Sequence, residues 1–326
     1  MFSLPILPAL KKKYPRCRIT WVIDEDYQIL LKSENLIDKL IVFPKKKLKK
    51  CIKERSFIKF CNLLFSTRAI LRKEKYDLIL DLQGLFRTNL LAYFCHSKNK
   101  ISLGSEFLGR FLCNKVFKRD KSERISSEYF ELSKTLGFHS NEFKPRFSLD
   151  KSVNINNVIP QEINLDKSFV IIPFTTRPEK HWDHSSWEEL TALLVRDFGY
   201  SCILLGHGLD SRQKILANNL TRYTAKSLID KTSLMEASVI ISKARFCIGV
   251  DTGLTHISVS LGQPTIAIFL STCPYLNPIN KNIKIIWTAN DFLNHRKDVA
   301  SSNTHTCLKK ITVSSVRTEV LSLVEN

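Results

Sequence analysis

The sequence has no apolar run long enough for a transmembrane helix, and its nine cysteines include no CxxC pair. A membrane-spanning helix needs about 20 consecutive apolar residues. An odd number of cysteines cannot form a complete disulfide framework, which favours a reducing compartment. The apolar stretch 2–10 precedes Lys11–Lys13, whereas a secretory signal peptide carries its positive charge before its apolar core. We therefore expect a cytoplasmic protein that can lie against an acidic surface.

Acidic residues are too few to balance the basic ones. The chain has 50 Lys and Arg residues against 31 Asp and Glu, a net charge of +19 at pH 7. Residues 1–150 carry 31 against 16, a net of +15, and residues 151–326 carry 19 against 15, a net of +4. A basic first half predicts an anionic partner, either nucleic acid, anionic lipid or a phosphorylated substrate. The sharpest run is KKKLKK at 45–50, for which a solvated loop is the alternative interpretation.

The chain is long enough to bury a core in one large or two medium domains, because 44% of its 326 residues are hydrophobic. Short apolar runs alternate with segments of helical spacing, which predicts parallel βα units. In the first half we expect strands at 18–24, 39–43 and 77–84 and helices at 57–76, 85–96 and 126–138. In the second half we expect strands at 167–174, 201–208, 245–250 and 264–270 and helices at 185–200, 233–244, 254–262 and 313–326.

The stretch 146–168 has no helical period and is rich in Asn, Ser and Asp, which is typical of a linker. We therefore expect an N-terminal Rossmann-like domain at 1–150, a linker at 151–166 and a C-terminal Rossmann-like domain at 167–326. Ligands of open α/β sheets bind at the carboxyl ends of strands. Functional residues are accordingly expected in the loops that follow the predicted strands.

The segment GVDTGLTHIS at 249–258 joins a predicted strand to a predicted helix. A helix N-terminus has unpaired N–H groups and a partial positive charge, which suits a pyrophosphate. Gly253 would let a ligand approach the backbone, while Thr252, Thr255 and His256 offer further polar groups. The alternative is that Asp251 or Thr252 only caps the helix. A cap does not account for the other polar residues, so we favour an anion site.

Three further polar clusters follow predicted strands. In the segment 173–182 the adjacent Thr175 and Thr176 precede cations that can clamp phosphate oxygens; the alternative is a helix-entry loop with solvated cations. In the segment 206–212 Asp210 can accept from ribose hydroxyls or cap the next helix. The segment DLQG at 81–84, followed by Arg87, is a candidate site or a polar turn with a surface arginine.

These clusters, in this order, resemble the glycosyltransferase family that contains the lipopolysaccharide heptosyltransferases. The resemblance is carried by DLQGLFRTNLLA (81–92), TTRPEKHW (175–182) and GVDTGLTHISVSLGQPTIAIF (249–269). The second segment is similar to the branch that adds the first heptose to the Kdo sugars of lipid A. The resemblance implies a GT-B fold, two Rossmann-like domains facing a central cleft, with an acceptor half followed by a nucleotide-sugar half.

The resemblance also implies a role for particular residues. The donor would be ADP-heptose and the acceptor Kdo2-lipid A, reached at the inner face of the cytoplasmic membrane. It implies no metal and no cofactor, because the helix dipole, hydroxyls and Lys180 would neutralise the diphosphate. The implied donor-binding residues are Thr175, Thr176, Lys180, Asp210, Thr232, Asp251, Thr252, Gly253 and His256. The implied acceptor-binding residues are Lys45, Lys46, Lys47, Lys49, Gln83 and Arg87.

The start of the sequence departs from the family pattern. Relatives begin with a strand and a Gly-Asp pair before the apolar helix that ends in LPAL, and that Asp is the expected general base. Counting back from LPAL at 7–10, Met1 falls on the Gly and Phe2 on the Asp. We therefore identify no catalytic residue and expect the first strand to be missing. Either translation starts upstream of Met1, or the gene is truncated.

Three activities compete. The first is inverting transfer of heptose to Kdo, with a second-heptose transferase as a related possibility. The second is a catalytically impaired remnant that still binds ADP. The third is nucleic-acid binding, which the charge alone suggests. Because KKKLKK has neither interleaved aromatic residues nor a recognition helix, we do not favour the third.

Overall fold

The computed structural model describes residues 1–119, 124–138, 143–150, 152–224, 226–276, 281–288 and 311–325. Apart from Met1, the chain divides into two compact units, Phe2–Phe143 and Lys144–Asn326. Each unit is an α/β structure whose described strands pair only in parallel. No helix among the described residues is long and apolar enough to cross a membrane.

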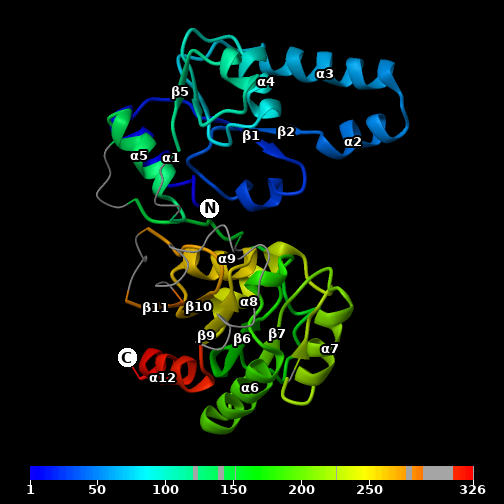
Figure 1. Cartoon of the computed structure of the whole chain (residues 1–326), viewed down its shortest axis with the longest axis vertical. Helices are drawn as coiled ribbons and strands as arrows, with labels where there is room; N and C mark the ends of the chain where they lie inside the picture. The colour runs from blue at the N-terminus through cyan, green and yellow to red at the C-terminus, as the bar shows by residue number, and fades with distance from the viewer. Residues whose placement is uncertain are drawn as a thin grey trace. The chain divides into compact units, whose positions relative to one another are not determined.

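The C-terminal unit is built on one parallel sheet (Figure 1). Its strands are β6 (Ser168–Ile172), β7 (Ser201–Leu204), β8 (Lys226–Ser227), β9 (Phe246–Val250), β10 (Thr265–Phe269) and β11 (Ile283–Trp287). Its helices are α6 (His184–Phe198), α7 (Ser211–Leu220), α8 (Leu234–Lys243), α9 (Gly253–Leu261) and α12 (Val313–Val324). The strand order is β11-β10-β9-β6-β7-β8. This is the doubly wound Rossmann order, which reverses direction between β6 and β9.

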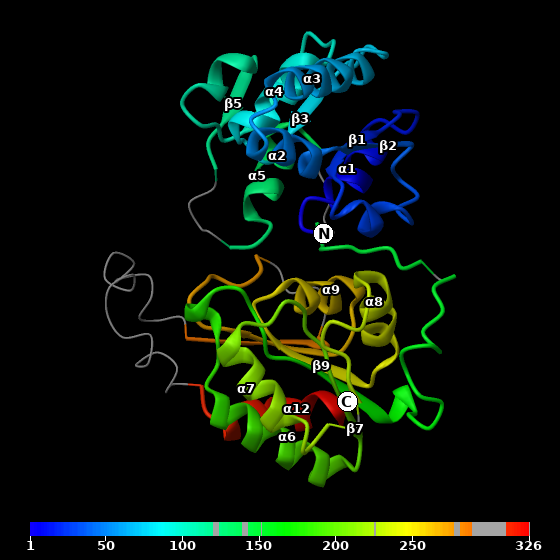
Figure 2. The ribbon, with the colours of Figure 1, turned by 90° about the vertical axis from the view of Figure 1, so that its right-hand side faces the viewer.

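Both faces of this sheet are covered, which explains why its central strands read as continuous apolar runs. Along β6, Phe169 and Ile171 face the cluster that includes α6, α7 and α12. Val170 and Ile172 face the opposite cluster, which includes α8. Figure 2 shows α8 and α9 on one side of the sheet and α6 and α12 on the other. The carboxyl ends of the strands are therefore held by a core that is apolar on both sides.

The N-terminal unit contains two smaller parallel sheets. The first pairs β1 (Thr20–Asp24) with β2 (Lys39–Phe43), and the second has the order β3 (Ile79–Asp81), β4 (Lys100–Leu103), β5 (Lys115–Phe117). Its helices are α1 (Ile6–Lys13), α2 (Lys45–Lys53), α3 (Phe57–Leu71), α4 (Phe86–Phe94) and α5 (Ser127–Thr135). Among the described residues no strand precedes α1, and β1 and β3 each have one edge without a strand partner.

The two small sheets share an apolar cluster. Trp21 of β1 and Leu80 of β3 pack with Ile6 and Ala9 of α1, together with Phe138. Helix α1 therefore covers both sheets, and its apolar face joins them although their strands do not pair with one another.

The lysine run differs from the solvated loop considered for it. Residues 45–53 form helix α2, in which Leu48 is buried while its lysine neighbours remain at the surface. Lysine is a good helix former, and the first two lysines of α2 are held by carboxylates: Lys45 pairs with Asp24 and Lys46 with Asp26. One buried leucine and two ion pairs thus fix a segment whose composition alone resembles a loop.

The expected linker packs on the C-terminal unit. Ile155 and Ile159 are buried against the same cluster as Val170 and Ile172 of β6. The segment has an irregular backbone and a mainly polar composition. Its few isoleucines nevertheless contribute to the core of the C-terminal unit. The boundary between the compact units lies before this segment, between Phe143 and Lys144.

Candidate functional site

The two strongest sequence clusters follow the two strands at which the C-terminal sheet reverses direction. Strand β6 ends at Ile172 and leads into the segment with Thr175 and Lys180. Strand β9 ends at Val250 and leads into Asp251. Because β6 and β9 are paired in parallel, their carboxyl ends lie at the same edge of the sheet. Open α/β sheets bind ligands at this reversal point.

Asp251 is the centre of a buried polar network. Lys180 Nζ lies 2.6 Å from Asp251 Oδ2, and His256 Nε2 lies 2.9 Å from Asp251 Oδ1. Thr272 Oγ1 donates a hydrogen bond to Oδ2. Burial alone would raise the pKa of Asp251, but His256, Lys180 and Thr272 together hold it well below its usual value. The carboxylate is therefore ionised and keeps Lys180 and His256 in place.

Tyr275 extends this network from the loop after β10. Its hydroxyl lies 2.7 Å from His256 Nδ1. Burial, with a further contribution from the charge of Asp251, raises the pKa of Tyr275 well above its usual value. The hydroxyl therefore stays protonated and can donate to Nδ1, while Nε2 of the same ring faces Asp251 Oδ1. Tyr275 thus fixes the orientation of the imidazole.

Helix α9 begins without a side-chain cap. Thr252 occupies the N-cap position in an extended conformation, and among the described residues no side chain makes a capping hydrogen bond there. The alternative that Asp251 or Thr252 merely caps this helix is therefore wrong. The first N–H groups of α9 point out of its N-terminus and have no side-chain acceptor in the part of the chain that the structure describes, which is the arrangement that binds phosphates.

Gly253 is the first residue of α9, and it is exposed. A Cβ added there would meet no atom within 4 Å among the described residues. The glycine is therefore required neither by packing nor by a left-handed backbone, and the space in front of it leaves the backbone accessible. Thr255 differs from expectation, since its buried hydroxyl lies against Gly249, 2.2 Å from where a Cβ of that residue would be. It does not face the start of the helix.

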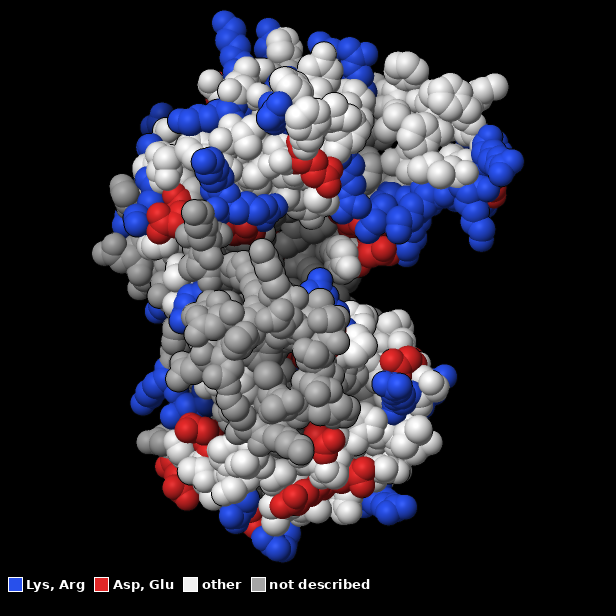
Figure 3. Space-filling model, in the orientation of Figure 1, with Lys and Arg blue, Asp and Glu red and all other residues white. Residues whose placement is uncertain are grey.

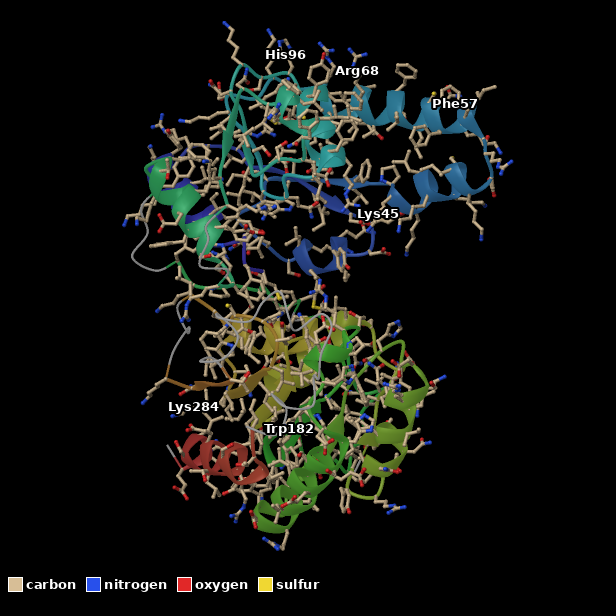
Figure 4. The ribbon with its side chains drawn as sticks, in the orientation of Figure 1. Lys45, Phe57, Arg68, His96, Trp182 and Lys284 are labelled. Carbon is tan, nitrogen blue, oxygen red and sulfur yellow. The ribbon has the colours of Figure 1, made fainter. Side chains whose placement is uncertain are left out.

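In the segment 173–182, Lys180 contributes a cation to the site, and other residues hold the loop in place by hydrogen bonds. Thr175 is buried, and its carbonyl oxygen accepts from Gln213 Nε2 and lies 2.8 Å from His181 Nε2. Trp182 is buried (Figure 4), where its indole donates to the carbonyl of Ile311. His181 and Trp182 thus hold the loop, while Thr176 is exposed beside the turn that ends in Lys180.

The two remaining donor candidates lie at helix entries. Asp210 is the N-cap of α7: its Oδ1 accepts from the backbone N–H of Gln213, whose side chain in turn accepts from the Asp210 N–H. The capping role considered for Asp210 is therefore present, and its contact with a ribose remains a prediction. Thr232 is half-buried in the turn before Ser233, the N-cap of α8.

Some acceptor candidates of the N-terminal unit meet at Asp24, at the end of β1. Lys45 Nζ lies 2.5 Å from Asp24 Oδ2, and the charge of Arg87 acts on the same carboxylate. Burial opposes the ionised form of Asp24, yet its hydrogen bonds and these cations lower its pKa. Lys47 and Lys49 are exposed on α2.

The DLQG segment is a turn fixed by its own residues. Asp81 is buried and accepts from the backbone N–H groups of Gln83 and Gly84, while Asn89 donates to its other oxygen at 2.6 Å. Gly84 has φ +65°, and a Cβ there would lie 2.4 Å from the carbonyl oxygen of Leu103. Asp81 and Gly84 therefore have structural roles in a polar turn, which was the alternative interpretation of this segment. Gln83 is exposed at the tip of that turn.

Phe2, which aligns with the expected general base, is half-buried just before α1. Its carbonyl oxygen accepts from the hydroxyl of Ser126. A phenyl ring cannot accept a proton, so this side chain cannot supply general-base catalysis.

No three His, Cys, Asp or Glu side chains of the described residues are grouped so that they could hold a metal ion.

Sequence reasoning missed Thr272 and Tyr275. Both follow β10, the strand next to β9, so the rule that polar residues collect at strand ends would have found them. They lie in STCPYL, which has no glycine-rich or charged pattern. Their position after a predicted strand was the only signal, and their contact with the Asp251 network could be recognised only from the strand order.

Comparisons with known proteins identify the family of the chain. A family model described as glycosyltransferase family 9 (heptosyltransferase) matches residues 64–306, more than half of the chain. Lipopolysaccharide heptosyltransferase 1 of Campylobacter coli is 27% identical over 311 residues, 90% of this chain and 86% of that protein. Lipopolysaccharide heptosyltransferase 1 of Escherichia coli is 25% identical over 281 residues, 85% of each chain.

Solved structures show the same fold. A glycosyl transferase family 9 structure from Veillonella parvula superimposes with a TM-score of 0.81 at 21% identity, covering 99% of this chain and 93% of that one. The E. coli heptosyltransferase WaaC, solved with ADP-2-deoxy-2-fluoro heptose, gives a TM-score of 0.68 at 21% identity, with 98% and 95% covered. The fold is thus GT-B, and the chain is a glycosyltransferase that belongs to glycosyltransferase family 9, the heptosyltransferase family.

Proposed function

We propose that this protein is an inverting heptosyltransferase of lipopolysaccharide core biosynthesis, which transfers L-glycero-D-manno-heptose from ADP-heptose to a Kdo residue of Kdo2-lipid A. The observation that carries the proposal is the pairing of Lys180 with Asp251 beside the uncapped N-terminus of α9. This arrangement lies at the reversal point of a Rossmann sheet, where a nucleotide diphosphate is expected.

The donor diphosphate would lie against the first turn of α9. Backbone N–H groups at Gly253 and the following residues would bind its oxygens, with Lys180 and the hydroxyls of Thr175, Thr176 and Thr252 around it. These groups stabilise negative charge that grows on the diphosphate as the sugar leaves. Asp210 and Thr232 would contact the adenosine part.

His256 has a supporting role in this proposal. Its ring contacts Tyr275 on one side and Asp251 on the other. The imidazole would therefore stay in a fixed orientation beside the leaving diphosphate. Because Asp251 keeps hydrogen bonds from His256 and Thr272, Lys180 can turn toward a phosphate without leaving the carboxylate unpaired. The network thus binds the donor while the buried charge stays satisfied.

The acceptor would meet the N-terminal unit. Lys45, Lys46, Lys47 and Lys49, with Gln83 and Arg87, would contact the carboxylates of Kdo and the phosphates of lipid A. Transfer to a lipid-linked acceptor would take place at the inner face of the inner membrane, with the protein bound peripherally to that surface.

The test is a transfer assay with ADP-heptose and two acceptors, Kdo2-lipid A and the same lipid already carrying one heptose. Transfer to the first acceptor supports the proposal, whereas transfer only to the second identifies a second-heptose transferase. Isothermal titration with ADP is run alongside. ADP binding without transfer to either acceptor would favour an impaired enzyme, for which Phe2 at the expected base position is the specific reason. Absence of ADP binding would refute the donor site.

A further inference from the structure

The hairpin formed by α2 and α3, residues 45–72, exposes an unusual amount of apolar surface. Phe57 is 76% exposed, Ile58 75% and Phe65 65%. On α3 only Thr67 and Leu71 are buried. Scattered apolar residues are common on protein surfaces, but a continuous set of large ones marks an interaction site.

These residues lie along one side of the helix. Phe57, Cys61 and Phe65 are four residues apart, and Ile58 is seven residues before Phe65, so helical geometry puts them on neighbouring positions of one stripe. Figure 4 shows Phe57 at the outer end of the hairpin, where α3 begins. The stripe therefore starts at the point of the hairpin that is farthest from the sheets of its unit (Figure 1).

The same hairpin carries the densest positive charge of the chain. Residues 45–72 contain ten Lys or Arg residues and a single acidic residue, Glu54. Nearly half of the net charge of +19 is thus concentrated in 28 positions. Figure 3 shows a blue surface along α2 next to the uncharged surface of α3. Among the described residues, neither Lys53 nor Lys59 has a carboxylate within salt-bridge distance.

We propose that the α2–α3 hairpin is the surface by which this protein docks on an anionic phospholipid bilayer. Phe57, Ile58 and Phe65 would enter the boundary between headgroups and acyl chains, and the lysines would bind lipid phosphates. An exposed apolar helix side next to clustered lysines is the composition of interfacial membrane-binding helices. This inference deepens the proposed function, because it names the surface that brings the enzyme to a lipid-linked acceptor.

Charge complementarity favours a bilayer over other occupants. A second copy of the hairpin would bring a like-charged surface against this one, and like charges oppose such pairing. A nucleic acid would match the lysines but leave the phenylalanines in water. An anionic bilayer has a negatively charged surface and an apolar layer beneath it. It would therefore complement both the lysines and the exposed apolar residues of the hairpin.

The test is co-sedimentation of the full chain with vesicles. One set contains phosphatidylcholine alone and the other phosphatidylcholine mixed with phosphatidylglycerol, and neither contains Kdo or lipid A. We expect binding to the anionic vesicles that weakens as salt rises. The double variant Phe57→Ser/Phe65→Ser is expected to bind at least about tenfold more weakly. The double variant Lys53→Gln/Lys59→Gln is expected to lose about 25-fold, since each lysine near an anionic surface contributes a factor of about five.

Matched controls lie on the other unit. Ile215 of α7 is 58% exposed, and Lys231 and Lys243 are exposed on the same unit as Ile215. Ile215→Ser and Lys231→Gln/Lys243→Gln are expected to bind the vesicles as the wild type does. The melting temperature of every variant is compared with that of the wild type, so that a folding defect is recognised.

Three outcomes would overturn the inference. The first is wild-type binding that does not depend on the anionic lipid. The second is unchanged vesicle binding by both hairpin variants. The third is a wild-type dimer, seen by sedimentation without vesicles, that Phe57→Ser/Phe65→Ser dissociates, since the stripe would then bind a second copy. Because the vesicles lack acceptor, failure of heptose transfer leaves these results unaffected and bears only on the proposed function.

Discussion

Replacing Lys180 by methionine is expected to weaken ADP binding about 10- to 150-fold. Lys180 Nζ is 2.6 Å from Asp251, and both side chains are largely shielded from solvent. A hydrogen bond to a charged group contributes about 1.5–3 kcal/mol, which corresponds to that range in Kd. Methionine keeps a flexible apolar chain of similar length, so the change removes the charge with little loss of volume.

The same substitution also affects stability, and the two effects must be separated. Removing one partner of a buried ion pair costs about 3–5 kcal/mol. We expect about 1–3 kcal/mol here, because His256 and Thr272 still donate to the Asp251 carboxylate. Adding Asp251→Asn removes the uncompensated charge, so the double variant should regain part of the free energy of unfolding that Lys180→Met loses.

ADP affinity and the free energy of unfolding should therefore change differently among the wild type, Lys180→Met, Asp251→Asn and the double variant. Isothermal titration with ADP and urea unfolding are measured for the wild type, both single variants and the double variant. The exposed Lys214 of α7 gives the matched control, Lys214→Met, which should change neither quantity. If the double variant binds ADP as the wild type does, the pair is purely structural and the donor site is misplaced.

Three further predictions test other parts of the site. Gly253→Ala should leave the melting temperature unchanged but weaken ADP binding at least about tenfold by blocking the backbone, whereas Gly249→Ala, where a Cβ would press on Thr255 and Ile172, should lower the melting temperature. Burial would raise the pKa of Asp251, but its hydrogen-bond donors lower the pKa below the usual value. The ionised carboxylate therefore stabilises the folded state above the unfolded-state pKa of about 3.9, and this contribution is lost as the pH falls below that value. The free energy of unfolding, followed by urea titration from neutral pH downward, should then fall more steeply for the wild type than for Asp251→Asn; equal slopes would contradict this. Phe2→Asp should transfer heptose up to about 10²-fold faster than Phe2→Asn, because only the carboxylate can accept a proton; equal rates would show that this position does not serve as the base.

The sequence predicted the four strands β6, β7, β9 and β10 of the C-terminal sheet because they are largely buried, whereas β11 (Ile283–Trp287) was not predicted. Strands such as β6 and β9 are short and buried along their whole length, with Ser168 as the one polar residue of β6, and each ends at a polar cluster. Strand β8 has only two residues, Lys226 and Ser227, and no apolar run marks it. In the N-terminal unit α2 was not evident, because a lysine run shows no helical period until the burial of Leu48 is known.

The candidate site was predictable in its parts but not in its connections. Each cluster could be found from polar residues that follow an apolar run. The pairing of Lys180 with Asp251 could not, because 71 positions separate them and only the adjacency of β6 and β9 brings them together. Thr272 and Tyr275 depend in the same way on the adjacency of β9 and β10.

This dependence on strand order explains how a buried carboxylate is compatible with the proposed diphosphate site. A lone carboxylate beside a diphosphate would repel it. Asp251, however, receives its donors from three segments: Lys180 from the loop after β6, His256 from helix α9 and Thr272 from the loop after β10. In the proposed donor complex, His256 and Thr272 would still donate to Asp251 when Lys180 turns toward the diphosphate, so the negative charge of Asp251 would remain compensated. On this proposal, Asp251 holds Lys180 in position in the absence of ligand and would release it at little cost, which a pairing of Lys180 with an acid that has no other donors could not achieve.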